Sequence, residues 1–183
     1  MKFIKTTLID LYVIEFEPIQ DNRGIFYRVF CKDELKEIGH QKEIVQINLS
    51  STVKKGAIRG MHFQYPPMVE NKMVKCLKGA VYDVAIDLRK NSSTFLQWYG
   101  EVLSAENFKM IYIPEGFAHG FQTLKKNSEL LYFHTEFYNA EHEGGIRYDD
   151  PLIGIKWPLE VSDISKRDRE HQFLSIDFKG IEI

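Results

Sequence analysis

The stretch Pro114-Glu115-Gly116-Phe117-Ala118-His119-Gly120, together with Arg59-Gly60-Met61-His62-Phe63 upstream, decides the fold of this chain. Each stretch carries a histidine in a run that alternates like a β-strand, with glycine or proline beside it. Small β-barrels place imidazoles in their interior in this way. We therefore expect an all-β fold in which both histidines face an internal cavity.

Strand-like runs separated by turn residues fill most of the rest of the chain. An opening strand over 8–16 is followed by a short helix over 32–38 that stops at Gly39, and a second helical segment starts near Ser165. Turns are expected at 54–56, 79, 90–93, 105–107, 114–116 and 125–127. Short strands at this spacing predict an antiparallel sandwich or barrel, here as a single domain over 1–183.

Composition narrows the possible functions. The chain has 183 residues, 44% of them hydrophobic, and a net charge of −2, which argues against a nucleic-acid-binding surface. No apolar stretch is long enough to span a membrane, and the N-terminus lacks the pattern of a secretory signal. Two cysteines without a CxxC pattern fit a reducing compartment, so we expect a cytoplasmic protein.

The two histidines first suggest a metal site. The matching barrel motif would supply His-x-His and then Glu, whereas this chain has His62-Phe63-Gln64 followed by Glu70. Divalent transition metals usually require two or three histidines with a carboxylate. With an amide in place of one imidazole, we expect no metal, and a pair of buried structural histidines is the competing interpretation.

Several stretches in order resemble one family, the dTDP-4-dehydrorhamnose 3,5-epimerases, which are metal-free cupin barrels. The resemblance runs from Asp21 to Asp168. It rests on 59–64, 79–89, 103–107 and 113–121, and on the later Asp149-Asp150-Pro151 and Ile155-Lys156-Trp157-Pro158. It implies a cupin-type antiparallel β-barrel (jelly roll) with short peripheral helices.

The resemblance also implies an isomerase that inverts C3, C5 or both in a nucleotide-diphospho-4-keto-6-deoxy sugar through an enolate, without a cofactor. The default substrate is dTDP-4-dehydro-6-deoxyglucose, which leads to dTDP-rhamnose and lipopolysaccharide O-antigen. Both carbons adjoin the carbonyl, so the reaction needs a base, an oxyanion stabiliser and an acid on the opposite face. The matching residues are His62 as base, Asp168 as its orienting carboxylate, Tyr132 as acid and Lys72 as enolate stabiliser.

Each of these roles has a plainer alternative. Asp168 also fits the third helical position of a capping box that begins at Ser165. Tyr132 fits an aromatic core residue, and Lys72 fits a solvated strand lysine. Asp83 could orient a histidine or pair with an arginine.

Substrate-binding residues follow from the same resemblance. They are expected to meet the diphosphate, sugar or base, and they comprise Arg23, Phe26, Gln46, Asn48, Arg59, His119 and Tyr138. The segment with Arg23 and Phe26 would reach the neighbouring subunit's site, which implies a homodimer.

Two departures from the family pattern leave the exact reaction open. Arg28 stands where relatives commonly carry a glutamate that would accept from thymine, so a CDP- or GDP-linked 4-keto sugar remains an alternative unless Arg28 points outward. His134 lies two residues after Tyr132, on the same strand face, and could change whether one or both carbons are inverted. A 3,4-ketoisomerase and a non-enzymatic sugar-binding cupin are also compatible with these residues.

Overall fold

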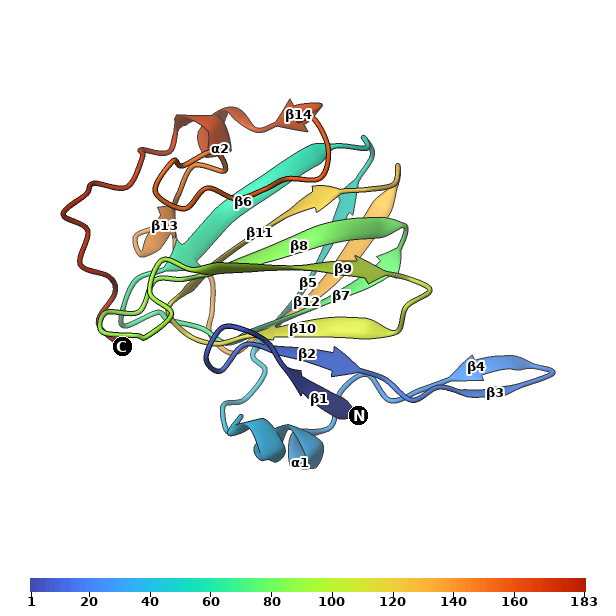
Figure 1. Ribbon diagram of the computed structural model, residues 1–183. Helices are drawn as coiled ribbons and strands as arrows, with labels where there is room; N and C mark the ends of the chain where they lie inside the picture. Colours follow the sequence, from blue (N-terminus) through green and yellow to red (C-terminus); the bar gives the residue numbers. More distant parts are fainter.

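Turn residues divide the chain into short strands, as the sequence predicts. The structure is a computed structural model of residues 1–183, and its elements are shown in Figure 1. The strands are β1 (Lys2–Lys5), β2 (Tyr12–Glu15), β3 (Ile19–Asp21), β4 (Gly24–Phe26), β5 (Gln46–Thr52), β6 (Ala57–Gln64), β7 (Lys72–Lys78), β8 (Ala80–Asp87), β9 (Trp98–Ser104), β10 (Lys109–Ile113), β11 (Phe117–Thr123), β12 (Ser128–His134), β13 (Glu143–Gly145) and β14 (Asp163–Ile164). The helices are α1 (Lys32–Leu35), the 3-10 helix η1 (Lys36–Ile38) and α2 (Lys166–Glu170). Every expected turn from 54–56 onward falls between two of these strands.

Two sheets pack face to face and form a jelly-roll barrel. One has the strand order β1-β2-β10-β7-β12-β5, and the other has the order β13-β6-β11-β8-β9. All pairs within them are antiparallel, and only the short β14 pairs with β6 in parallel. The all-β prediction is confirmed. The strands β5 and β6 are consecutive in the chain but belong to different sheets, which face each other.

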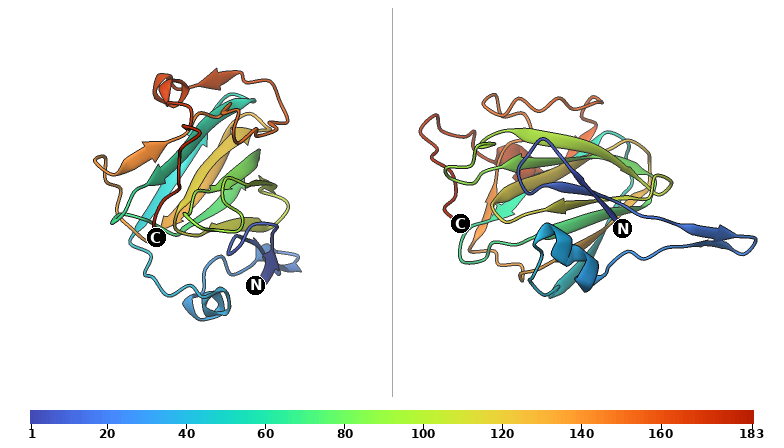
Figure 2. Two further views of the ribbon diagram at one scale, coloured as in Figure 1. Left: turned by 60° about the vertical axis from the view of Figure 1, so that its left-hand side comes forward. Right: turned by 60° about the horizontal axis from the view of Figure 1, so that its bottom comes forward.

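Apolar side chains form three layers around these sheets. Between the sheets, buried residues of both interdigitate, for example Val74 and Ile111 with Ala85 and Phe121. The outer face of the first sheet is covered by the α1 region through Leu35. The outer face of the second sheet is covered by the C-terminal segment, residues 146–183, which runs beside β6 in both figures (Figures 1 and 2). Because this segment packs along β6, it brings α2 to the mouth of the barrel.

The two motifs that decide the fold lie side by side on β6 and β11. His119 is the register partner of His62, and a bulge follows before Phe121. Glycines allow this approach: a Cβ on Gly60, whose φ is +121°, would lie 2.6 Å from the Cα of Gly120. The glycines of both motifs therefore let the strands approach closely at the point where both histidines face the interior.

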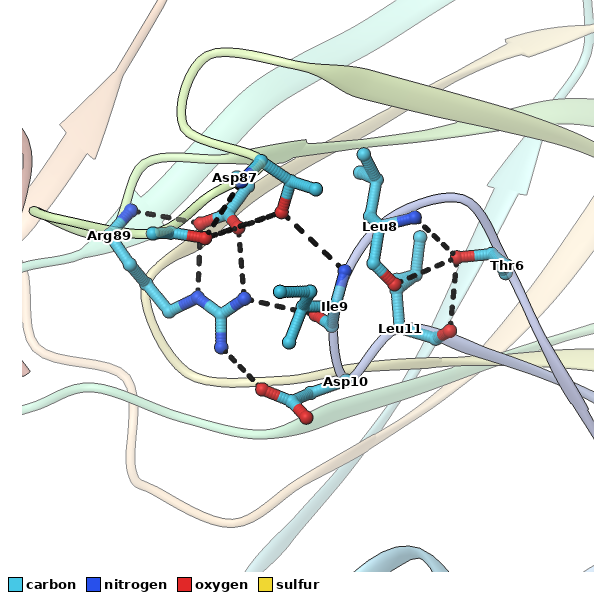
Figure 3. Close-up of polar contacts among 9 residues, drawn as sticks. Thr6, Leu8, Ile9, Asp10, Leu11, Asp87 and Arg89 are labelled. Carbon is cyan, nitrogen blue, oxygen red and sulfur yellow. Dashed lines mark hydrogen bonds and ion pairs between the residues drawn. The ribbon is translucent and has the colours of Figure 1, made fainter.

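The expected opening strand over 8–16 is wrong in its first half. The chain forms β1 earlier, turns, and enters the sheet again only at Tyr12. Figure 3 shows the cause: the Thr6 hydroxyl accepts from the backbone N–H of Leu8 and donates to the carbonyl of Leu11 at 3.0 Å. The Arg89 guanidinium binds both the Ile9 carbonyl and the Asp10 carboxylate in the same turn. Apolar residues are buried in this turn, so hydrophobicity alone did not distinguish it from a strand.

The hairpin β3–β4 projects from the barrel. In Figure 1 and in the right-hand view of Figure 2 it extends away from both sheets. Its apolar side chains Ile19 and Phe26 are 70% and 74% exposed. Separately, no helix in the structure has the length and hydrophobicity needed to cross a membrane.

Candidate active site

A cavity of about 690 Å³ opens between the two sheets at the end where α2 lies. It brings together nine of the residues that the sequence predicted for the site, from both sheets and from the C-terminal segment. They are Gln46, Asn48, Arg59, His62, Lys72, His119, Tyr132, Tyr138 and Asp168. The cavity volume is in the range typical of small-molecule sites.

His62 and Asp168 form a hydrogen-bonded pair on one wall. His62 Nε2 lies 2.9 Å from Asp168 Oδ1, and the second oxygen, Oδ2, accepts from the backbone N–H of Gly60 at 3.2 Å. Burial alone would raise the pKa of Asp168, but the hydrogen bond and charge of His62, with the Gly60 N–H, hold that pKa well below its usual range. A permanently ionised carboxylate therefore fixes the imidazole, and the remaining nitrogen, Nδ1, has no hydrogen-bond partner in the protein.

The capping alternative explains the helix start but not the Asp168 side chain. Ser165 is the N-cap of α2, and its hydroxyl accepts from the Asp168 backbone N–H at 3.0 Å. In a full capping box the carboxylate would return to the N-cap N–H. The Asp168 carboxylate instead points to Gly60 and His62, so the cap positions this residue while leaving its carboxylate to the dyad.

A second histidine–carboxylate pair lies deeper in the cavity. His119 Nε2 lies 2.9 Å from both oxygens of Asp83, and Asp83 is fully buried. Burial lowers the pKa of His119 and raises the pKa of Asp83, and for each group it outweighs the opposite effect of the partner. The sequence left the partner of Asp83 open between a histidine and an arginine, and the structure pairs it with the histidine.

Tyr132 lies on the opposite sheet from His62, on β12. Its ring packs edge-on against His119, with centroids 5.9 Å apart, and stacks on His134 at the same distance with an interplanar angle of 12°. Burial raises the pKa of Tyr132 well above its ordinary value, so its hydroxyl keeps its proton at neutral pH. Because the two sheets face each other, a protonated phenol and an imidazole face the cavity from opposite walls.

Glu70 joins Lys72 and His134 beside this phenol. Its carboxylate lies 3.1 Å from Lys72 Nζ and 2.6 Å from His134 Nδ1. Burial acts to raise the pKa of Glu70, but the Lys72 charge and the His134 contacts outweigh it and lower that pKa to about 2. Sequence reasoning considered Glu70 only as a metal ligand, and its ion pair with Lys72 was missed although the two residues are close in sequence.

The ligand set of a cupin metal site is not available here. Gln64, where the second imidazole would stand, donates to the carbonyls of Met68 and Phe137 and accepts from the Asn139 N–H. Its amide is therefore hydrogen-bonded to the backbone of two loops, one between β6 and β7 and one after β12. Since Glu70 and His119 also have close partners, a metal held by His62, Gln64, Glu70 and His119 does not fit these residues.

Three predicted substrate-binding residues lie outside the cavity of their own chain. Arg23 and Phe26 are on the projecting hairpin, and Arg23 pairs with Asp21. Arg28 follows the hairpin, and its guanidinium lies 2.6 Å from Glu34 in the α1 region. Residues of this segment can therefore meet a ligand in this kind of cavity only across an interface with another chain.

Comparisons with known proteins place these features in context. The family model for dTDP-4-dehydrorhamnose 3,5-epimerase matches residues 5–175. The dTDP-4-dehydrorhamnose 3,5-epimerase of Methanothermobacter thermautotrophicus is 45% identical over 171 residues, which cover 92% of this chain and 91% of the relative.

Solved structures agree with this match. The structure of the Bacillus anthracis dTDP-4-dehydrorhamnose 3,5-epimerase with TDP and PPi bound superposes with a TM-score of 0.91 at 39% identity, covering 94% of this chain and 99% of that chain. A Legionella pneumophila dTDP-6-deoxy-D-glucose-3,5-epimerase in complex with dTDP-4-keto-L-rhamnose gives a TM-score of 0.89 at 39% identity, covering 94% and 92%.

Proposed function

The chain belongs to the dTDP-4-dehydrorhamnose 3,5-epimerase family, and on that premise we propose that His62 and Tyr132 perform the epimerisation as a base and an acid on opposite walls of the cavity. As a member of this family the protein is an isomerase of nucleotide-linked 4-keto sugars. The proposed substrate is dTDP-4-keto-6-deoxyglucose, with inversion at C3 and C5.

The observation that carries the proposal is the placement of His62 and Tyr132 on facing sheets. Asp168 holds His62 through Nε2 at 2.9 Å, so Nδ1 is the nitrogen that accepts a proton from C3 or C5. The resulting enolate is planar at that carbon. A proton returned by Tyr132 from the other side then gives the inverted centre, and such positioned proton transfers contribute about 10²–10⁴-fold each.

The developing O4 oxyanion needs positive charge or donors beside it. Lys72 supplies a charge at the cavity wall, and its partner Glu70 fixes the ammonium within 3.1 Å of the carboxylate. His119 supplies a buried N–H donor to the sugar, held by Asp83. Arg59 lies at the same mouth with its Nε donating to Thr52 at 3.0 Å, and its outer N–H groups suit the diphosphate.

The nucleotide is proposed to lie across the mouth formed by Gln46, Asn48 and Tyr138. The exposed Tyr138 ring offers a stacking face for a base. In the sequence, Arg28 was the residue that left a CDP- or GDP-linked sugar open as an alternative substrate. Its ion pair with Glu34 supports the outward-pointing interpretation of that residue, and with it a thymidine nucleotide.

The homodimer belongs to the same proposal. Hairpin β3–β4 exposes Ile19 and Phe26, and the edge strand β5 beside the cavity exposes Ile47 and Leu49 at more than half of their surface. An unpaired apolar edge favours association with another chain. We propose that a second copy covers this edge and extends its hairpin, with Arg23 and Phe26, over the cavity mouth.

Deuterium exchange tests the proposed chemistry. Wild-type enzyme incubated with dTDP-4-keto-6-deoxyglucose in D₂O and EDTA should place deuterium at C3 and C5, and His62→Asn should not. CDP- and GDP-linked 4-keto sugars serve as competing substrates. Exchange that persists in His62→Asn, or that stops on chelation, would contradict the proposal. A product with the carbonyl at C3 would indicate a 3,4-ketoisomerase instead.

A further inference from the structure

His171 lies beside the proposed base and has no role in the proposed reaction. Its ring packs edge-on against His62, with centroids 5.9 Å apart, just after α2 ends. Its Nε2 is buried from solvent and has no hydrogen-bond partner. An unpaired polar atom inside a protein is costly, so this nitrogen beside the proposed base calls for a partner that the protein itself does not supply.

Three potential metal ligands meet at this point. One nitrogen each of His62 and His171 and one carboxylate oxygen of Asp168 all lie within 4.8 Å of one another. The His171 ring packs directly against Gly145: a Cβ there would lie 2.2 Å from both Cε1 and Nε2 of the ring, so this glycine leaves the space that the ring occupies.

We propose that His62, Asp168 and His171 bind a divalent transition-metal ion, with Zn²⁺ as the preferred ion, and that this ion inhibits the enzyme. Two imidazoles and one carboxylate form a common three-ligand set for zinc, which leaves a fourth position open to water. Ligand atoms of a tetrahedral zinc lie about 3.3 Å apart, so the three groups must close by about 1.5 Å at most. This site differs from the cupin metal position, because it uses the C-terminal segment instead of Gln64, Glu70 and His119.

Inhibition follows from the tautomer of His62. In the metal-free enzyme Nε2 carries the proton that it shares with Asp168, and Nδ1 is free to act as base. A metal can bind Nε2 only through its lone pair, so the proton of the neutral ring must move, through solvent, to Nδ1. The nitrogen that faces the substrate then carries a proton and no lone pair, and C3 and C5 cannot be deprotonated.

Arg167 opposes metal binding at the same point. Its guanidinium lies 3.2 Å from His62 Nε2 and 3.5 Å from Asp168 Oδ1, and it also pairs with Glu143 at 3.0 Å. The side chain is more than half exposed, so it can turn away into solvent. A positive charge so close to an incoming cation weakens its binding, and Arg167→Gln should therefore bind metal more tightly than the wild type.

Metal titration tests the site without reference to catalysis. Co²⁺ added to the purified protein should bind with a stoichiometry of one and give the intense visible absorption of a tetrahedral ion. Zn²⁺ should displace it, and EDTA should remove both. His171→Ala and His171→Asn should each lower the affinity for Zn²⁺ by at least roughly 10–100-fold, which is what the loss of an outer-shell partner costs. Arg167→Gln should strengthen it, and thermal melts of all variants report folding.

The inhibition arm rests on the proposed function and uses deuterium exchange. Zn²⁺ should stop deuterium exchange in the wild type at the concentration that fills the site. The His171→Asn variant should exchange normally without metal, and its inhibition should need an at least tenfold higher Zn²⁺ concentration. A wild-type protein that binds no Co²⁺ or Zn²⁺, or His171 variants that bind them as tightly, would overturn the proposal. If no substrate shows exchange, the proposed function fails, and the titration still decides the metal site.

Discussion

Asp168→Asn separates the two roles that this residue can have. Asn keeps the size of the side chain, and its oxygen can still accept from the Gly60 N–H. Its amide nitrogen, however, can only donate to His62 Nε2, where the carboxylate accepts at 2.9 Å. The imidazole must then carry its proton on Nδ1, so the proposed base is blocked although the fold and the N-cap of α2 are kept.

The expected loss is large and falls on kcat. A positioned general base contributes about 10²–10⁴-fold, and the same replacement in a Ser–His–Asp triad costs about 10⁴-fold through the wrong tautomer. We therefore expect kcat to fall by about 10²–10⁴-fold, which corresponds to about 3–5 kcal/mol in activation free energy. KM should change little, because the Asp168 side chain is almost completely buried behind His62.

The matched control is Ser165→Ala, which removes the hydroxyl that caps α2 and leaves the carboxylate. It should lower the free energy of unfolding by about 1 kcal/mol and keep most of the activity. Steady-state kinetics with dTDP-4-keto-6-deoxyglucose and urea unfolding measure both effects. If Asp168→Asn keeps more than a tenth of wild-type kcat, or if Ser165→Ala loses as much activity, Asp168 acts only through the helix and the dyad is refuted.

Three further perturbations test other parts of the structure. Because the pKa of Glu70 is lowered from 4.5 to about 2, its ionisation stabilises the fold above pH 4.5 by on the order of 3 kcal/mol, and this is lost as the pH falls towards 2. In urea unfolding, the advantage of the wild type over Glu70→Gln should therefore shrink from pH 5 to pH 2, and a constant difference would disprove the pairing with Lys72. Co-expressed Phe26→Ala and His62→Asn chains should recover activity that neither has alone, because one site of each mixed dimer is intact if the hairpin acts in trans; an inactive mixture would show that it does not. Arg89→Met removes the positive partner of the buried Asp87 carboxylate, which keeps its hydrogen bonds from Ser92 and Thr94. The variant should lower the free energy of unfolding by about 3–5 kcal/mol and leave deuterium exchange into the substrate, per folded molecule, unchanged.

The strands from β5 to β12 and the placement of the two histidines could be predicted from the sequence. Alternation, with glycines and asparagines between the runs, predicts strands and turns regardless of which strands later pair. The glycines beside His62 and His119 mark the close approach of β6 and β11. Because both histidines face inward, their neighbours at even spacing line the same cavity, and the resemblance assigned roles to them.

The pairing of buried polar groups could not be predicted in the same way. Which group meets Asp83 depends on the register of β8 against β11, and register is a property of the assembled sheet. Glu70 and His171 lie in loops, where no periodicity indicates direction. The turn at Thr6 could not be predicted either, because a short run of apolar residues gives the same sequence pattern in a strand and in a buried turn.

The stereochemistry of exchange in Tyr132→Phe tests the two-wall mechanism most directly. The variant keeps His62 and loses the acid, so in D₂O it should incorporate deuterium at C3 or C5 with the original configuration, while the inverted product is strongly reduced. His62→Asn should incorporate none. NMR of the recovered sugar distinguishes configuration and label at each carbon. Inversion at wild-type rates in Tyr132→Phe, or loss of all exchange in that variant while His62→Asn still exchanges, would contradict the assignment of base and acid.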